Sequence, residues 1–368
     1  MKFGIITYIQ HTEFEDQYYS YSPYIREMDL WMQHVGETIV LAPKTNRYPD
    51  RSEIPYKCQP DFIKVKPLNF NTFMNAIISF IRLPLIIVNI WEVFNQSDHI
   101  HLRCPGNISL LGCIVQILFP KKAKTVKYAG NWDPDSKQPW TYKLQKKILS
   151  NRLLSRNLKV LVYGKWKNQT ANVIPFFTAS FSEKDRKRVS KEFSGTLNFI
   201  FVGTLSEGKQ PLFAIQLIEY LLDKGIEANL KLYGTGILKE ELHNYIANSK
   251  FSGAINLKGF IDKNELKSEY LKSHFLILPS KSEGWPKAVA EAMFFGCIPI
   301  ATSISCVSWM LDHGKRGILI PDNIDSARKI VYEKLRNATK LNDMANLAQE
   351  WSQKYTLERF DREITKFL

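Results

Sequence analysis

The chain has 368 residues, of which 45% are hydrophobic and 23% are charged. A typical domain uses roughly 100–200 residues, so we expect two domains. The composition is ordinary for a globular protein and excludes a disordered, collagen-like or disulfide-scaffold class. Because 50 Lys and Arg stand against 36 Asp and Glu, the formal net charge is +14. Such an excess indicates a polyanionic neighbour: nucleic acid, an anionic membrane or a phosphorylated substrate.

The N-terminal sequence MKFGIITY predicts a strand that begins the fold at once. It has neither the long apolar region nor the small-residue cleavage site of a secretory signal. The five cysteines are odd in number and follow no metal-binding spacing: Cys58, Cys104, Cys113, Cys297 and Cys306. We therefore expect reduced thiols and a cytoplasmic protein.

Apolar strand-like runs alternate with helical spacing throughout the first half, which is typical of a parallel α/β sheet. The predicted strands are residues 3–8, 37–42, 62–65, 99–103, 123–128 and 159–163. The predicted helices between them are residues 23–35, 73–94, 109–119 and 140–154. Residues 8–24, which are rich in Tyr, are expected to form a loop that suits sugar stacking.

The most apolar stretch is residues 74–94, but Arg82 and Pro84 interrupt it. A membrane span needs about 20 largely uninterrupted apolar residues. We predict a buried helix pair of an α/β domain. The alternative is a helix that packs on the core and also touches a membrane surface.

A charged stretch within residues 170–195 predicts a linker, and a second α/β series follows it. The strands predicted in this series are residues 197–202, 229–233, 255–257, 275–278, 298–301 and 317–320. We predict an N-terminal domain at residues 1–175, a linker at 176–195 and a C-terminal domain at 196–350. Residues 351–368 are expected to form a closing helix that packs back toward the first domain. Doubly wound domains bind ligands at the carboxyl ends of their strands, so we expect the chemistry on strand-to-helix loops.

The most informative motif is PSKSEGWPKAVAEAMFFGCIP, at residues 279–299. A strand ends at Pro279, and Pro286 suits the first turn of a helix whose N-terminus attracts phosphate. The carboxylates of Glu283 and Glu291 would repel phosphate, so they point to sugar hydroxyls. Eight residues of helix cover about 12 Å, which is enough to bind a hexose at one Glu and a ribose at the other.

This motif resembles the Glu-x7-Glu region of retaining glycosyltransferase family 4 (glycosyltransferases group 1). The resemblance is dense over residues 199–321 and mainly architectural in the first half. It implies an α/β GT-B fold, with two Rossmann-like doubly wound domains facing a central cleft. It implies that Glu291 holds the donor ribose and that Glu283 contacts the transferred sugar. It also implies that the residues after Glu283 approach the sugar and diphosphate: Gly284, Trp285, Pro286 and Lys287.

The sequence FVGTLSEGKQP, at residues 201–211, is a strand, a small-residue loop and a helix start. Gly203 allows close backbone approach, and Lys209 offers a charge for a diphosphate. The resemblance makes Lys209 catalytic together with Glu283, but Thr204 stands where the family has Arg. It also places Gly234 beside the nucleotide and Gly259 and Phe260 at the base. The alternative for Phe260 is a core aromatic.

In the first half, DHIHLR puts His99 and His101 on one face of a strand. No third ligand is evident, so we predict a packed pair and not a metal site. The sequence also offers an acceptor site at two strand ends. The expected acceptor-binding residues are Tyr8, Asn131, Trp132 and Asp133. Asp133-Pro134-Asp135 matches the metal motif of a different glycosyltransferase fold, and we predict a plain loop there.

The resemblance implies a retaining glycosyltransferase that moves a sugar from a nucleotide-diphosphate donor to a glycan or lipid-linked acceptor, in cell-surface polysaccharide assembly. No metal or other cofactor is expected. The alternative is a non-catalytic or epimerase-type nucleotide-sugar-binding protein of the same fold.

The charge is uneven. Residues 1–180 carry 23 basic and 13 acidic side chains (+10), and the rest carry 27 and 23 (+4). With no nucleic-acid-binding motif present, we expect peripheral contact with the inner, anionic face of the cell membrane and no nucleic-acid partner.

Overall fold

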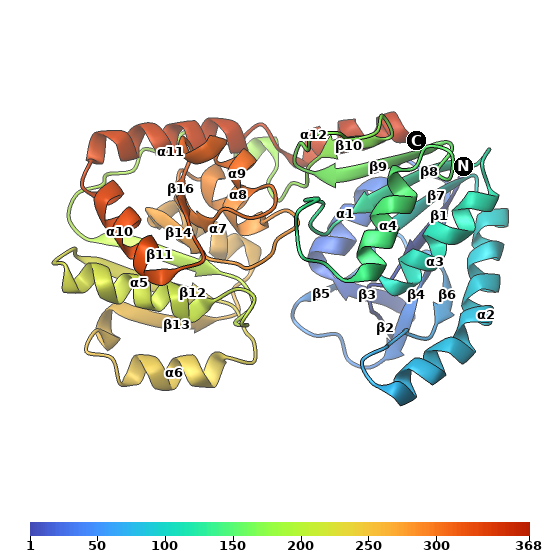
Figure 1. Ribbon diagram of the computed structural model, residues 1–368, viewed down its shortest axis with the longest axis horizontal. Coiled ribbons are helices and arrows are strands. Elements are labelled where there is room, and N and C mark those ends of the chain that lie inside the picture. Colours follow the sequence, from blue (N-terminus) through green and yellow to red (C-terminus); the bar gives the residue numbers. More distant parts are fainter. The chain divides into compact units, whose positions relative to one another are not determined.

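A computed structural model describes residues 1–368 and divides the chain into two compact units, each of which is an α/β structure (Figure 1). Unit 1 comprises Met1–Phe176 together with Asp361–Leu368, and unit 2 comprises Phe177–Phe360. The division therefore falls one residue after the boundary predicted at residue 175. Almost all of the expected linker belongs to unit 2, and only the last eight residues of the expected closing helix belong to unit 1.

Unit 1 is built on a ten-stranded sheet in the order β10-β9-β8-β7-β1-β4-β2-β3-β5, with β6 paired to β4. Its strands are β1 Lys2–Thr7, β2 His11–Phe14, β3 Gln17–Tyr21, β4 Glu37–Asn46, β5 Glu53–Pro55, β6 Asp61–Val65, β7 His99–Cys104, β8 Ala123–Tyr128, β9 Leu158–Tyr163 and β10 Val173–Phe176. Its helical elements are α1 Ser22–Met32, α2 Phe73–Gln96, α3 Asn107–Val115, η1 Gln116–Leu118 and α4 Trp140–Ser150.

The Tyr-rich segment after β1 is not the predicted loop. Strands β2 and β3 pair antiparallel across it, with His11 opposite Ser20 and Phe14 opposite Gln17. His11 is fully buried, and its Nε2 lies 2.8 Å from the Tyr56 hydroxyl. The hairpin thus extends the sheet beyond β4, because its polar side chains find partners on neighbouring strands.

The predicted buried helix pair is also wrong, because residues 73–96 form one continuous helix, α2. The Thr72 hydroxyl caps its start by accepting a hydrogen bond from the Asn75 amide at 3.2 Å. One side of α2 packs on the sheet through Ile86, Ile90, Val93 and Phe94, which are buried. By length and composition alone, α2 is long and apolar enough to cross a membrane. Only 17% of its most apolar 18-residue stretch is buried.

Unit 2 is a six-stranded parallel sheet in the order β13-β12-β11-β14-β15-β16. Its strands are β11 Leu197–Val202, β12 Ala228–Tyr233, β13 Ile255–Gly259, β14 Phe275–Leu278, β15 Ile298–Thr302 and β16 Ile318–Ile320. Its helical elements are η2 Glu183–Asp185, α5 Pro211–Asp223, α6 Lys239–Ala247, η3 Ser252–Ala254, α7 Lys263–Lys272, α8 Lys287–Phe294, α9 Val307–Met310, η4 Asp312–Gly314, α10 Ile324–Leu335 and α11 Ala338–Ser352.

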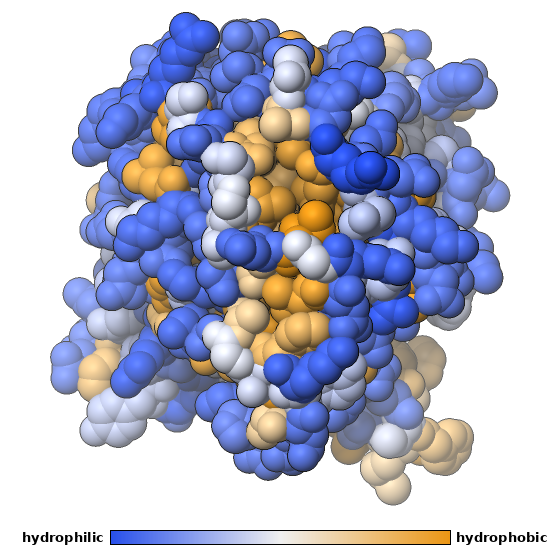
Figure 2. Space-filling model, turned by 90° about the vertical axis from the view of Figure 1, so that its left-hand side faces the viewer, coloured by the Kyte–Doolittle hydropathy of each residue, from blue (hydrophilic) through white to orange (hydrophobic).

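A continuous apolar cluster of unit 2 lies on one face of its sheet, where alternate strand residues pack with residues of α5 and α10. On the other face, Ile200, Leu276 and Leu278 are also buried. Phe199 and Phe275, on neighbouring strands, stack with ring centroids 4.9 Å apart. Figure 2 shows one face of unit 2, where apolar side chains are gathered in a strip between hydrophilic borders. Apolar strands covered on both faces explain why the strand positions of this unit were readable from sequence.

The expected linker is tied into unit 2 by a buried lysine. The Nζ of Lys191 donates hydrogen bonds to the carbonyls of Tyr270 and Leu271, at 2.9 and 2.6 Å. These carbonyls belong to the last turn of α7, where helix carbonyls lack intrahelical partners. The Tyr270 carbonyl also accepts from Cys297 Sγ at 2.9 Å and from the Ser273 amide at 3.3 Å. The chain then closes with α12 Leu357–Ile364 and η5 Thr365–Phe367. The closing helix predicted at residues 351–368 is therefore shorter, because α11 extends to Ser352 and a break precedes α12.

Candidate active site

The candidate site of unit 2 lies where its sheet changes direction. From β11 the chain builds outward to β12 and β13, and from β14 it builds the other way to β15 and β16. Doubly wound sheets bind ligands outside the carboxyl ends of the strands at such a switch point. The loops that follow β11 and β14 meet there. The Lys281 amide donates to the Gly208 carbonyl at 2.9 Å, and the Gln210 side chain donates to the Pro279 carbonyl at 2.6 Å.

The loops after β11, β12 and β13 are joined backbone to backbone. The Gly203 amide donates to the Tyr233 carbonyl at 3.0 Å, and the Gly234 amide donates to the Gly259 carbonyl at 2.8 Å. A Cβ on Gly234 would lie 1.8 Å from the Gly203 carbonyl oxygen, and its φ is +143°. Only glycine fits there, and the close approach presents backbone in place of side chains at this edge.

Lys209 and Glu283, predicted from separate motifs, form an ion pair in the structure. The lysine side chain is 29% exposed and the glutamate side chain 9%. The pair joins the loop after β11 to the loop before α8, so the two predicted catalytic residues occupy one place. Thr204 is exposed on the first of these loops, and Lys281 is exposed on the second.

Glu291 projects from α8, and two hydroxyl groups hold its carboxylate. Ser180 Oγ donates to one oxygen, and Tyr270 Oη donates to the other at 3.3 Å. Burial, together with the negative charge of Glu291, raises the pKa of Tyr270 well above its usual value, so this hydroxyl stays a donor. Sequence reasoning missed both partners. Ser180 is 111 residues away along the chain, and no local pattern signals such a contact.

The remaining predicted donor residues differ in exposure. Phe260 is 50% exposed, so the alternative of a core aromatic is wrong. Trp285 and Pro286 are buried. The indole of Trp285 stacks on Trp351, with ring centroids 6.2 Å apart, and packs against Tyr355 at 5.8 Å. Any contact of Trp285 with a donor therefore falls to its backbone, while its ring fixes the start of α8.

In unit 1, the predicted acceptor residues divide between surface and core. Tyr8 follows β1, is 40% exposed and lies against Gly106, where a Cβ would come within 2.5 Å of the Tyr8 ring. Asn131 is nearly buried, and its side-chain oxygen accepts from the Asp133 amide at 2.9 Å. Trp132 is only 5% exposed and packs edge-on against Tyr128, at 4.8 Å between centroids. The Trp132 ring is therefore packed in the core of unit 1, and a contact of this residue with the acceptor stays a prediction.

Asp133-Pro134-Asp135 forms the predicted loop. Asp133 accepts from the Asp135 amide at 3.0 Å, and its carbonyl accepts from Lys146 Nζ at 3.0 Å. Burial lowers the pKa of Lys146 to about 8, although Asp133 opposes this shift. The geometry is that of an Asx turn closed by a lysine.

Sequence reasoning also missed a buried ion pair at the carboxyl end of β7. Arg103 pairs with Glu27 of α1 and lies over the Tyr24 ring, 5.9 Å from its centroid. Burial acts to lower the pKa of Arg103, but Glu27 more than offsets it and the pKa rises. A cation is therefore fixed beside the same sheet edge as Tyr8.

The histidine pair on β7 is packed and hydrogen-bonded, as predicted. His99 Nε2 and His101 Nδ1 each lie 2.9 Å from the Thr125 hydroxyl. Burial lowers the pKa of His99 to about 4 and of His101 to about 3, so both rings are neutral near pH 7. No group of three or more His, Cys, Asp or Glu in the chain is arranged to hold a metal ion.

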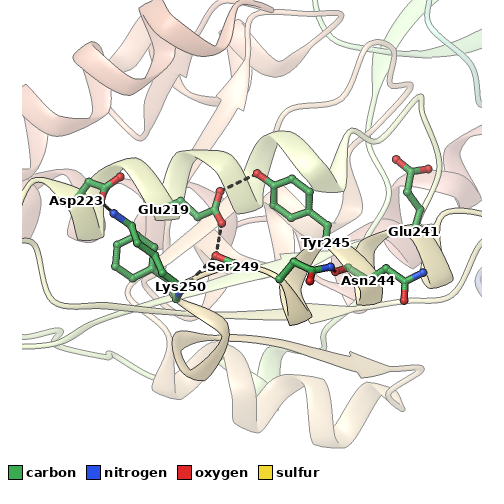
Figure 3. Close-up of a pocket in the computed structure, with 9 residues that line it drawn as sticks. Glu219, Asp223, Glu241, Asn244, Tyr245, Ser249 and Lys250 are labelled. Atoms are coloured by element: carbon green, nitrogen blue, oxygen red, sulfur yellow. Dashed lines mark hydrogen bonds and ion pairs between the residues drawn. The ribbon is translucent and has the colours of Figure 1, made fainter.

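A cavity of about 600 Å³ lies elsewhere in unit 2, between α5 and α6 (Figure 3). Its polar groups are largely paired with one another. Glu219 accepts from Tyr245 Oη at 2.9 Å and from Ser249, and Asp223 pairs with Lys250 at 2.5 Å. These residues occupy the later turns of α5 and α6 and the loop beyond. They lie at the opposite end of the helices from the loops described above, so this cavity is separate from the candidate site.

The described geometry can now be compared with known proteins. Residues 182–351 match the family model for glycosyl transferases group 1. An uncharacterised glycosyltransferase of Methanocaldococcus jannaschii is 28% identical over 178 residues, 46% of this chain and 48% of that protein. The putative colanic acid biosynthesis glycosyltransferase WcaL of Salmonella typhimurium is 24% identical over 181 residues, which are 47% of this chain and 45% of that protein. The chain thus spans about half the length of these two relatives.

A longer alignment connects the chain to an uncharacterised 41.2 kDa protein of the cps region of Klebsiella pneumoniae. It is 23% identical over 333 residues, 81% of this chain and 87% of that protein. The family model covers less than half of this chain, and each of these three relatives is less than 30% identical to it. The comparisons therefore show a similarity to group 1 glycosyltransferases that is concentrated in unit 2.

Solved structures agree on the fold. Sucrose-phosphate synthase from Thermosynechococcus elongatus has a TM-score of 0.68 at 14% identity, covering 99% of this chain and 97% of its own. HepE from Anabaena, solved in complex with UDP, has a TM-score of 0.67 at 14% identity, covering 100% and 99%. The fold is GT-B, with two Rossmann-like domains, as the sequence predicted.

Proposed function

We propose that the protein is a retaining glycosyltransferase that uses a nucleotide-diphosphate sugar as donor. One observation carries this proposal: Lys209 and Glu283 meet at the switch point of the unit 2 sheet, and Glu291 is held on the adjoining helix. A cation for a diphosphate and two carboxylates for sugar hydroxyls match the chemistry of such a donor.

The residues divide the work as follows. Lys209 neutralises charge that develops on the departing diphosphate, and the N-terminus of α8, with Lys287 in its first turn, adds favourable electrostatics. Glu283 orients the transferred sugar. Glu291, whose carboxylate is fixed by Ser180 and Tyr270, accepts hydrogen bonds from the ribose. Lys209 is paired with Glu283, and we expect phosphate oxygens of a bound donor to compete with this carboxylate for the lysine.

For the acceptor, we propose a class of molecule and not one compound. A glycan or lipid-linked saccharide is the proposed acceptor, met by Tyr8, Asn131 and Asp133 of unit 1. The name of WcaL and the cps-region origin of the Klebsiella protein support a role in cell-surface polysaccharide assembly. HepE was solved with UDP, which makes UDP-sugars the first donors to test. We propose no metal or other cofactor, and a cytoplasmic protein at the inner face of the membrane.

One observation favours a second candidate. Thr204 stands where the resemblance expects an Arg, so the charge available to the leaving diphosphate is smaller. A non-catalytic or epimerase-type nucleotide-sugar-binding protein of the same fold requires less positive charge beside the diphosphate than a transferase does.

Turnover separates the two candidates. Purified protein is incubated with a panel of UDP- and GDP-sugars and scored for release of the nucleoside diphosphate and for the anomer of the sugar product. Lys209→Ala and Glu283→Ala are expected to abolish release with an unchanged melting temperature. Exposed residues of α10 provide the matched controls, Lys329→Ala and Glu333→Ala, which should behave as wild type. Release by the wild type that persists in both site variants would refute the assigned roles, and binding without any release would favour the second candidate.

A further inference from the structure

One face of α2 is apolar and open to solvent. Ten apolar side chains of this helix are exposed, most strongly Phe73, Met74, Phe80, Ile81 and Leu85. They recur every three or four residues from the first turn to Trp91, so they form a single stripe about 27 Å long at 1.5 Å per residue. Figure 1 shows α2 along the outside of unit 1. A patch of this size on a soluble protein is unusual and marks an interaction site.

The stripe continues onto the neighbouring helix. Helix α3 packs beside α2, and its exposed positions carry Ile114, followed by Leu118 of η1. The two helices are joined at their far ends by Trp91, whose ring lies 4.7 Å from that of Phe119. We call the exposed side of α2, α3 and η1 the apolar platform.

The segment that contains the platform is rich in basic residues. Residues 62–182 contain 17 Lys and Arg and four Asp and Glu, although Arg103, Lys124 and Lys127 are buried. Lys64 and Lys66 precede α2, Lys121 follows η1, and Lys143 and Lys147 lie on α4, which packs on α3. All five are exposed. Only Arg82 and Glu92 interrupt α2 itself.

The buried side of α2 limits the orientations in which this helix could contact lipid. Ile90, Val93 and Phe94 are fully buried in the core of unit 1, and Val93 closes against Gly4 of β1, where a Cβ would meet it at 2.8 Å. Spanning a bilayer would strip this face from the sheet and expose the core. A helix held in this way can contact lipid only while lying in the plane of the interface.

We propose that the apolar platform docks unit 1 on an anionic lipid bilayer, with α2 parallel to the surface and the surrounding lysines on the headgroups. Apolar area and basic charge act together here, and an interfacial helix needs both. Because helices run antiparallel to the strands they connect, the first turns of α2 lie toward the carboxyl edge of the sheet, where Tyr8 and Arg103 lie. Docking brings that edge close to lipid-linked molecules.

The first test is vesicle flotation with the full chain. Vesicles of phosphatidylcholine alone are compared with vesicles containing roughly one-third phosphatidylglycerol, at low salt and at about 0.5 M salt. The wild type should float with the anionic vesicles only, and less so at high salt. Ile81→Gln combined with Leu85→Gln should weaken partitioning at least tenfold, because both side chains are largely exposed and their loss removes apolar area without opening the core.

Matched variants isolate the surface. Ile237→Gln combined with Leu347→Gln removes exposed apolar side chains from unit 2 and should leave flotation unchanged. Lys143→Gln combined with Lys147→Gln should weaken binding at low salt by about tenfold and have little effect at high salt. Equal melting temperatures would show that all variants fold.

A fluorescent label reports the orientation. In a Cys58→Ser background, which removes the one exposed cysteine, Ile81→Cys and Leu347→Cys are labelled with an environment-sensitive dye. Anionic vesicles should shift the emission of the first to the blue and leave the second unchanged. The proposal is overturned if the wild type does not float with anionic vesicles, or if the Ile81/Leu85 variant floats like wild type. It is also overturned if that variant instead abolishes a concentration-dependent dimer, which would assign the platform to a second copy of the chain. These readouts need no turnover, so they fail independently of the proposed enzyme activity.

Discussion

Gly234→Ala tests whether the three donor loops depend on backbone contact. In the structure the new Cβ would lie 1.8 Å from the Gly203 carbonyl oxygen, whereas real Cβ contacts essentially never fall below 3.0 Å. The two loops must therefore separate by more than 1 Å. The φ of +143° adds strain, because L-residues rarely adopt it.

The cost follows from these two effects. Backbone strain contributes about 1–3 kcal/mol, and weakening the hydrogen bond between Gly203 and Tyr233 contributes about 1 kcal/mol more. A total of roughly 3 kcal/mol in a unit of this size lowers its melting temperature by about 6–12 °C. Because the Gly203 loop moves, affinity for UDP should also fall tenfold or more. Calorimetric melting and titration of UDP measure the two effects.

The control is Gly253→Ala, in η3 of the same unit. No atom lies within 4 Å of its Cβ position, and its φ is not in the left-handed region. It should melt like wild type. A Gly234→Ala variant that melts within 1 °C of wild type and binds UDP equally would refute the reasoning about the loops.

Four further predictions concern single side chains. Burial holds the pKa of His99 near 4 and of His101 near 3, below the unfolded value of about 6.5, so the unfolded chain takes up protons between pH 7.5 and 5.5 that the folded chain does not. Urea titrations should therefore show the unfolding free energy falling by roughly 1.4 kcal/mol per histidine over this range. An unfolding free energy that does not change with pH would contradict this. Lys191→Met should lower the unfolding free energy of unit 2 by about 1–2 kcal/mol, because the Leu271 carbonyl loses its lysine donor, whereas the Tyr270 carbonyl keeps Cys297 Sγ and the Ser273 amide; a melting curve equal to wild type would argue against it. Ser180→Ala should weaken nucleotide-sugar binding several-fold at unchanged stability, which calorimetric titration would reveal, since one of the two hydroxyls that orient Glu291 is lost. Thr204→Arg should speed nucleoside diphosphate release in a turnover assay by supplying a second cation, and a slower or equal rate would count against the proposed role of this loop.

The parts of the fold that the sequence predicted are those with strong apolar runs. The central strands β14 and β15 of unit 2 are buried on both faces, so each appears as a short apolar segment bounded by Gly, Pro or charged residues. The hairpin of β2 and β3 was missed for the opposite reason. Its residues are mostly polar, its turn contains Glu15 and Asp16 in place of glycine, and its stability comes from partners elsewhere in the chain.

Helix α2 illustrates a different limit. Its position was predicted, but its environment was not, because apolar composition is the same for a helix inside a core and a helix whose outer face meets lipid. Only the placement of Ile90 and Phe94 against the sheet separates the inner face from the outer one. The mean hydropathy of a segment does not contain that information.

The sequence predicted the charged residues of the candidate site but not the residues that hold them in place. Lys209 and Glu283 stand out because each lies in a short loop after a strand, and the sheet brings those loops together. Ser180 and Tyr270 act only through Glu291, across long stretches of chain. The burial of the Trp132 ring was not predicted either, because an aromatic residue after a strand end can pack in a core as well as line a binding surface.

The most direct test of the central claim is calorimetric titration of UDP-sugars, UDP and UMP into wild type, Lys209→Ala and Glu291→Gln, with GDP counterparts alongside. The account predicts that wild type binds one diphosphate nucleotide and prefers it to the monophosphate. Lys209→Ala should lose most of that preference, whereas Glu291→Gln should weaken both nucleotides by about tenfold or more, since the ribose contact is common to them. If no nucleotide sugar binds, or if both variants bind every nucleotide as wild type does, the assignment of the donor site to the switch point of unit 2 is contradicted.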